Sequence, residues 1–127
     1  NDVNQLIWNS VSTPDELELA LAEAKRLGQF SLIDVYADWC VACQPIEKEV
    51  FPRSDVQTAL KEIYLIKLDL SQYDASQDLI LKKYEILGPP TLLFMSPKAQ
   101  EIRALRLTGT FKADLLLKQI MHLKDEQ

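Results

Sequence analysis

The sequence has few of the residues that build metal centres or disulfide networks. It contains two cysteines and one histidine in 127 residues, and His122 lies far along the chain from both cysteines. A zinc site needs about four ligands, so these three residues argue against an intramolecular zinc ion. Two cysteines also do not make a disulfide-rich secreted scaffold, and a bridge spanning three residues closes too small a loop to stabilise the fold much.

Two further absences concern membranes and nucleic acids. No apolar stretch is long enough to cross a bilayer, and no basic segment followed by an apolar one opens the chain. The 14 Lys and Arg residues are interleaved with 19 Asp and Glu residues, and the net charge is −5. Without a basic stripe, nucleic acid and anionic membrane surfaces are poor candidates for partners.

The length and composition indicate one globular domain over residues 1–127. Apolar residues make up 47% of the chain and charged residues 26%, which is ordinary for a domain with a single core. The first residue is Asn1 rather than methionine, and we expect a domain excised from a longer protein.

Hydrophobic periodicity predicts alternating strands and helices. Strands are expected at residues 5–8, 30–36, 63–70, 91–95 and 102–108. Helices are expected at residues 14–27, from the cysteine motif towards residue 50, and at 54–61, 75–84 and 111–123. This order predicts an α/β fold in which a mixed central sheet is flanked by helices on both faces.

Local signals mark the ends of several expected helices. Thr13 and Glu16 form a capping box with Pro14 at the first helical position, and Gly28 is the expected stop. A second capping signature begins at Ser54. The apolar face of the last helix is expected to consist of Leu115, Leu116, Ile120 and Leu123.

Both cysteines lie in the sequence Trp39-Cys40-Val41-Ala42-Cys43, directly after an expected strand. Two thiols at this spacing at the start of a helix can close a small disulfide ring and open it again, because the helix N-terminus favours the thiolate. We expect Cys40 to be the partly exposed nucleophile and Cys43 the shielded resolving thiol. A structural pair of core cysteines is the alternative. Pro45, inside the expected helix, predicts a kink or a delayed start.

Two acidic residues flank the motif. Asp34 lies inside an apolar strand, where burial would raise its pKa and allow it to exchange protons with Cys43. Glu47 lies one helical turn beyond Cys43; its alternative role is that of a solvated helix residue. If both acids face the cysteines, their negative charge raises the pKa of the thiols and restrains their reactivity until a partner docks.

The sequence Gly88-Pro89-Pro90-Thr91 lies between an expected helix and an expected strand. A proline at this position can adopt a cis peptide and leave neighbouring backbone groups free. Those groups could pair with an extended substrate segment lying over the sulfur. The alternative is an ordinary turn before a strand.

Taken together, these residues resemble the thioredoxin superfamily over nearly the whole chain. The stretch 34–40 is similar to the strand, buried aspartate and tryptophan that precede the thioredoxin active site. The resemblance implies a thioredoxin fold, with a redox pair tuned by the two acids and no metal or further cofactor. It further implies a cis-proline at Pro90, substrate contacts from Trp39, Thr91 and Gly109, and a strand lysine, Lys67, near the buried aspartate.

The octapeptide at residues 36–43, followed by Glu47, Lys48 and Phe51, resembles the C-terminal periplasmic domain of the DsbD family of thiol:disulfide interchange proteins. This likeness implies a monomeric periplasmic domain of a bacterial inner-membrane protein. The domain would relay electrons from the transmembrane domain to the N-terminal periplasmic domain of the same protein. Pro45 and the doubled Pro89-Pro90 depart from the pattern expected across that family.

Two alternative functions stay open at this point. One is a general thioredoxin-like reductase, for example one serving cytochrome c maturation. The other is a non-catalytic binding module that keeps the fold for docking. The direction of electron flow depends on the reduction potential of the pair relative to its partners, which the sequence does not state.

Overall fold

The computed structural model describes residues 6–126. The strands are β1 (Asn9–Val11), β2 (Ser31–Tyr36), β3 (Tyr64–Asp69), β4 (Thr91–Met95) and β5 (Leu107–Thr108). The helices are α1 (Pro14–Leu27), α2 (Cys43–Pro45), α3 (Ser54–Ala59), α4 (Ala75–Tyr84) and α5 (Ala113–Lys124). A π-helical segment follows α2 at Ile46–Val50, and a 3-10 turn lies at Arg103–Leu105. The predicted α/β class is confirmed.

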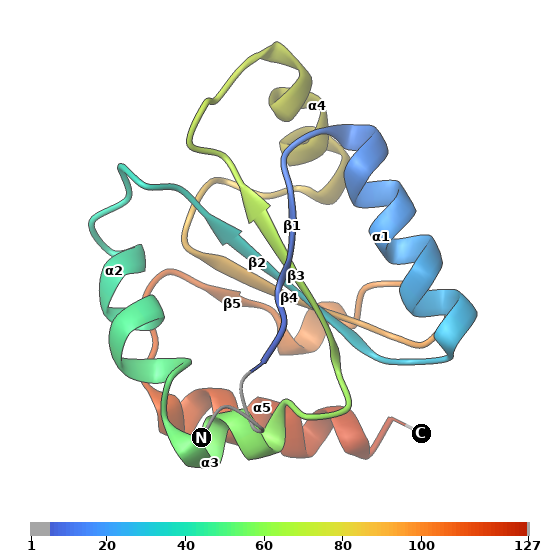
Figure 1. The fold of residues 1–127 in the computed structure, drawn as a ribbon, viewed down its shortest axis with the longest axis vertical. Helices are drawn as coiled ribbons and strands as arrows, with labels where there is room; N and C mark the ends of the chain where they lie inside the picture. The colour runs from blue at the N-terminus through green and yellow to red at the C-terminus, as the bar shows by residue number, and fades with distance from the viewer. Residues whose placement is uncertain (1–5, 127) are drawn as a thin grey trace.

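The five strands form one mixed sheet in the order β1-β3-β2-β4-β5. β1, β3 and β2 are parallel, β4 is antiparallel to β2, and β5 is antiparallel to β4. Helices α1 and α4 cover one face of the sheet, and α3, α5 and the π-helical segment after α2 cover the other (Figure 1). The loop after β2 carries the cysteine motif at the end of the sheet where the parallel strands finish, which is where open α/β sheets usually hold their functional groups.

The central strand β2 contributes side chains to both apolar clusters of the core. Alternate residues of a strand point to opposite faces. Ile33 and Val35 accordingly pack in the apolar cluster under α1 and α4, and Leu32 packs in the cluster under α3, α5 and the π-helical segment. Asp34 shares the face of Leu32, so a carboxyl group lies on the side of the sheet that holds the second apolar cluster.

Helix α1 begins and ends where its caps predict. Thr13 Oγ1 accepts a hydrogen bond from the Glu16 backbone N–H at 3.1 Å, and Glu16 Oε1 accepts one from the Ser12 N–H at 2.8 Å. The Glu16 carboxylate thus accepts its hydrogen bond from Ser12, the residue before the N-cap. Gly28 ends the helix in the left-handed conformation at φ 68°, which glycine adopts without strain.

Both edges of the sheet differ from the prediction. The first strand lies at Asn9–Val11 and not at residues 5–8, of which residue 5 lies outside the described residues. The strand predicted at 102–108 is reduced to Leu107–Thr108. The cause is the turn in which the Leu105 N–H donates to the Ile102 carbonyl, because that turn buries Leu105 against the core.

The helix after the cysteine motif is irregular. It begins at Cys43 rather than at Cys40 and becomes π-helical after Pro45. Proline has no N–H to donate to the preceding turn, so the delayed start predicted from Pro45 is confirmed.

Two further helix predictions need correction. Ser54 is the first helical residue of α3 and not its cap; Arg53, in an extended conformation, is the N-cap. Leu115 is 42% exposed and does not belong to the buried face of α5. The helical repeat instead buries Ala113, Leu116, Ile120 and Leu123. No helix in the described part of the chain is long and apolar enough to span a bilayer.

Candidate functional site

Cys40 and Cys43 form a disulfide, with their Cα atoms 5.3 Å apart. Two consecutive turns create this geometry. The Cys40 N–H donates to the Ala37 carbonyl at 3.1 Å, and the Cys43 N–H donates to the Cys40 carbonyl at 3.2 Å. Because Ala37 directly follows β2, the turns hold both sulfurs at the carboxyl end of the central strand.

Both cysteines are buried in this disulfide-bonded form. Cys40 is 6% exposed and Cys43 2%, so Cys43 is the more shielded of the two, as predicted, but Cys40 is less exposed than expected. The exposed groups beside them are Trp39 and Val41, at 55% and 85%. The surface next to the disulfide therefore carries two exposed apolar side chains.

The loop before β4 lies beside the cysteine motif. The peptide bond between Pro89 and Pro90 is cis, as predicted. The next residue, Thr91, pairs with Val35, which lies two residues before Ala37. This pairing brings the proline loop to the same end of β2 as the disulfide.

The same loop contacts the residues after β5. The Gly109 N–H donates to the Pro90 carbonyl at 2.9 Å, and Thr91 Oγ1 donates to the Gly88 carbonyl at 2.6 Å. Three predicted substrate-contacting residues, Pro90, Thr91 and Gly109, are thus brought together. The carbonyls of Gly88 and Pro90 each accept one internal hydrogen bond, so each has one of its two lone pairs left for a substrate.

Strand register brings the two predicted acids to one lysine. Asp34 of β2 lies opposite Lys67 of the parallel strand β3, so both side chains leave the same face of the sheet. Lys67 Nζ lies 3.9 Å from Asp34 Oδ2 and forms an ion pair and hydrogen bond with Glu47 Oε1. Glu47 belongs to the π-helical segment that covers this face.

Asp34 is the buried acid of this cluster. It is 5% exposed, and its Oδ2 has no hydrogen-bond partner within residues 6–126. Burial raises the pKa of Asp34 well above its ordinary value of 3.8, neighbouring Glu47 raises it further, and Lys67 offsets part of the effect. The raised pKa predicted from the sequence is confirmed in direction and in cause.

Two aromatic rings flank the lysine. Lys67 Nζ lies 5.7 Å from the centroid of Trp8 and 4.7 Å from that of Tyr36. The position of Lys67 beside the buried aspartate agrees with the thioredoxin resemblance. The contact with Trp8 was not predicted, and no local signal marks it, because it depends on the pairing of β1 with β3.

The acidic cluster and the disulfide are neighbouring but separate units. The ion pairs described for Asp34 and Glu47 lead to Lys67 and not to a sulfur atom. In the described part of the chain, no group of three or more His, Cys, Asp or Glu residues could hold a metal ion.

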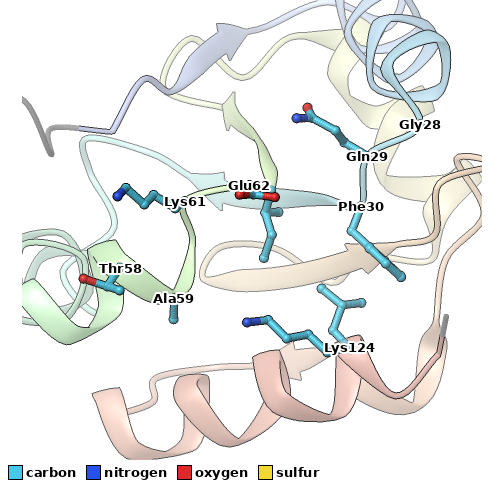
Figure 2. A pocket seen from close by; sticks show the side chains of 10 residues that line it. Gly28, Gln29, Phe30, Thr58, Ala59, Lys61, Glu62 and Lys124 are labelled. Atoms are coloured by element: carbon cyan, nitrogen blue, oxygen red, sulfur yellow. The ribbon is translucent and has the colours of Figure 1, made fainter.

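A separate cleft of 480 Å³ lies away from these residues. Figure 2 shows Gln29 and Phe30 on the segment that leads into β2, and Glu62 before β3, with Lys124 of α5 beside them. These segments precede the parallel strands, whereas the cysteines follow β2. The cleft therefore lies at the opposite end of the sheet, and no predicted site residue lines it.

Comparison with known proteins agrees with this geometry. A family model described as a thioredoxin-like domain matches residues 17–124. The thiol:disulfide interchange protein DsbD 2 of Pseudomonas aeruginosa is 45% identical over 104 residues, which are 82% of this chain and 18% of that protein. DsbD of Escherichia coli K12 is 39% identical over 122 residues, which are 96% of this chain and 21% of that protein. The chain thus spans about a fifth of the length of these relatives.

Solved structures share the fold. The oxidised C-terminal domain of Neisseria meningitidis DsbD matches with a TM-score of 0.79 at 21% identity, over 89% of this chain and 97% of that chain. A thioredoxin from Thermus thermophilus matches with a TM-score of 0.72 at 23% identity, over 94% and 88%. Since the family match also covers most of the sequence, the chain belongs to the thioredoxin-like domain family.

Proposed function

We propose that this chain is the thiol:disulfide exchange domain of a DsbD-like protein and acts as a protein-disulfide reductase. The observation that carries the proposal is the Cys40–Cys43 disulfide at the carboxyl end of β2, beside the Pro90 loop of a thioredoxin-like fold. The names of the relatives describe thiol:disulfide interchange and support the same chemistry. The cysteine pair is itself the redox group, and the reaction needs no further cofactor.

The reaction proceeds in two exchange steps. The Cys40 thiolate attacks one sulfur of the partner's disulfide, which forms an intermolecular disulfide and releases the partner's other sulfur as a thiolate. Cys43 then loses its proton and attacks Cys40 Sγ, which closes the Cys40–Cys43 disulfide and releases the second partner sulfur. Two electrons pass to the partner, whose two thiolates take up two protons, while the domain loses the protons of its two thiols.

Asp34 is proposed as the group that accepts the proton of Cys43. A carboxylate held in a buried site, with its pKa raised by burial, is a better base than an exposed aspartate. Glu47 tunes this group through Lys67, which it shares with Asp34.

The partner segment is proposed to lie across Trp39 and the loop formed by Pro90, Thr91 and Gly109. Trp39 is half exposed beside the disulfide, and the hydrogen bond from Gly109 to Pro90 holds the proline loop to the residues after β5. An extended segment that contacts both Trp39 and this loop would bring its disulfide to Cys40.

The partners are inferred from the relatives and from the residues at 36–43. In a DsbD-like protein, the transmembrane domain would reduce the cysteine pair, and the N-terminal periplasmic domain would receive the electrons. The chain would then be a monomeric periplasmic domain of a bacterial inner-membrane protein. Its span of about a fifth of the relatives' length supports this place in a longer chain.

Trapping the intermolecular disulfide tests the proposal. The Cys43→Ser variant should form a covalent adduct with the oxidised N-terminal domain of the parent protein, and the adduct should separate under reducing agent. The Cys40→Ser variant is the matched control and should form none. If Cys43→Ser forms no adduct while mass measurement shows that the wild-type pair oxidises reversibly, the relay to that partner is wrong.

Two measurements distinguish the alternatives. A general thioredoxin-like reductase should reduce insulin as fast as it reduces the N-terminal domain, and a binding module should fail to cycle with a mild oxidant. Equilibration with glutathione gives the reduction potential of the cysteine pair. For this two-electron couple, a difference of about 30 mV corresponds to roughly 1.4 kcal/mol. A strongly oxidising potential would reverse the assigned direction.

A further inference from the structure

Trp8 lies outside every motif described so far and next to the acidic cluster. It directly precedes β1, whose Ser10 lies opposite Lys67 of β3. Since alternate residues share a face, Trp8 follows the same side of the sheet as Ser10 and Lys67. The side chain of Asn9 donates to the Leu65 carbonyl at 3.0 Å and fixes this segment against β3.

The indole ring connects two elements that are distant in the sequence. Its centroid lies 4.8 Å from that of Phe51, directly after the π-helical segment, and the rings are tilted by 44°. Lys67 Nζ lies 5.7 Å from the same ring centroid. The ring therefore contacts both the residue that follows the π-helical segment and the ammonium group.

A small cleft of 290 Å³ opens beside this ring. It is lined by Leu6, Trp8, Glu47, Phe51, Pro52 and Gln57. Glu47 faces the cleft and also pairs with Lys67, which in turn lies 3.9 Å from Asp34. A line of contacts thus leads from solvent at the cleft to the buried carboxyl group, and Trp8 forms one wall at its entrance.

We propose that Trp8 is a positioning residue of the redox site: it limits the access of water to the buried Asp34 and holds the Lys67 ammonium group against the carboxylates of Asp34 and Glu47. This inference rests on the proposed function of the cysteine pair. A cation over an aromatic face is attracted to it, and the attraction between charges falls as water enters.

The groups that face the cluster determine the direction of the effect. Asp34 comes from β2, Lys67 from β3 and Glu47 from the π-helical segment; Tyr36 adds a ring over Lys67, and the β4 residue opposite Asp34 is the uncharged Leu92. Burial is the largest cause of the raised pKa of Asp34, and the opposing effect of Lys67 is smaller. Water admitted by loss of the ring should therefore lower the pKa of Asp34, even if Lys67 also becomes more mobile.

The test is the titration of Asp34 in the oxidised domain. Carbon NMR of the aspartate carboxyl groups follows it, with Asp34→Asn assigning the signal. Trp8→Ala should move the titration to lower pH, and Trp8→Phe, which restores an aromatic ring, should keep it near the wild-type position. Ile7→Ala is the matched control, because the neighbouring Ile7 is 80% exposed.

A second variant keeps the test valid if Trp8→Ala does not fold. Gln57→Ala widens the same cleft from α3 without touching the ring, and should also move the titration to lower pH. In Trp8→Ala the exchange rate on the rising part of the pH profile should change by roughly two- to fivefold, the size of one aromatic–cation contact.

The outcomes separate this inference from the proposed function. An Asp34 titration that stays in place in Trp8→Ala and Gln57→Ala overturns the inference, as does an equal shift in Trp8→Phe. The titration involves no partner and no exchange chemistry. A domain that fails to reduce disulfides but shows the predicted shifts would therefore refute the proposed function and leave the role of Trp8 standing.

Discussion

Replacing Asp34 with asparagine should make the oxidised domain more stable at neutral and alkaline pH. The carboxylate is 5% exposed, and its Oδ2 lacks a hydrogen-bond partner in the described part of the structure. Asparagine occupies nearly the same space but cannot ionise, so the cost of burying the charged form disappears. The free energy of unfolding should rise by about 1.4 kcal/mol for each tenfold decrease that burial causes in the acid dissociation constant of Asp34. The change does not leave the Lys67 ammonium group unpaired, because the ion pair with Glu47 remains.

The gain should depend on pH in a defined direction. Burial raises the pKa of Asp34 in the folded state above the value near 3.8 expected for the unfolded chain. Below that value both states of the wild type hold the proton, and the stabilising effect of the protonated carboxyl group is fully present. As the pH rises, the unfolded chain ionises first, and the wild type loses stability until the pH passes the folded pKa. The difference between the variant and the wild type should therefore grow with pH and then level off.

Urea unfolding of the oxidised proteins from pH 4 to pH 9 measures this difference. Asp125→Asn is the control, because Asp125 is exposed near the end of the chain and should give a small difference with little pH dependence. A pH-independent gain for Asp34→Asn, or a loss of stability at pH 8, would refute the reasoning that the ionised carboxylate destabilises the fold.

Three other substitutions probe separate parts of the structure. Lys67→Met should lower the free energy of unfolding at pH 7 by roughly 1–3 kcal/mol, because Asp34 and Glu47 lose their shared cation. This value lies between the ranges for exposed and for buried ion pairs. An unchanged free energy of unfolding in urea would contradict the prediction. Leu116→Ala should lower the free energy of unfolding by about 2–5 kcal/mol, because removal of the fully buried side chain leaves a cavity. A loss under 1 kcal/mol in the same urea measurement would count against the described core. Thr13→Ala should lower the free energy of unfolding by about 1 kcal/mol through loss of the α1 cap, with Thr13→Ser retaining most of the stability in thermal unfolding.

Local signals predicted the parts of the fold that depend on near neighbours in the chain. The cap at Thr13 and the stop at Gly28 delimit α1, and the apolar run at 30–36 becomes the central strand. These features follow from hydrogen bonds within one turn and from the alternation of side chains, so a short window of sequence contains their cause. The strand predicted at 102–108 is present only at Leu107–Thr108, because burial of Leu105 favoured a turn over continued pairing.

The candidate site likewise has features that the local sequence predicts and features that depend on strand pairing. The spacing of Cys40 and Cys43 permits a disulfide whatever the rest of the chain does, and a charge at Asp34 inside an apolar strand is visible in the sequence alone. The residues that contact this charged group cannot be identified from the sequence alone. Lys67 reaches Asp34 through the pairing of β2 with β3, and Trp8 reaches Lys67 through the pairing of β1 with β3.

The sequence by itself therefore determined the redox pair, the class of fold and the buried acid. Only the tertiary structure decided which cation the acid shares, which ring covers that cation and which carbonyl groups of the proline loop are already engaged. The physical reason is strand register: it aligns residues tens of positions apart on one face of the sheet, and no local pattern in the chain specifies that alignment.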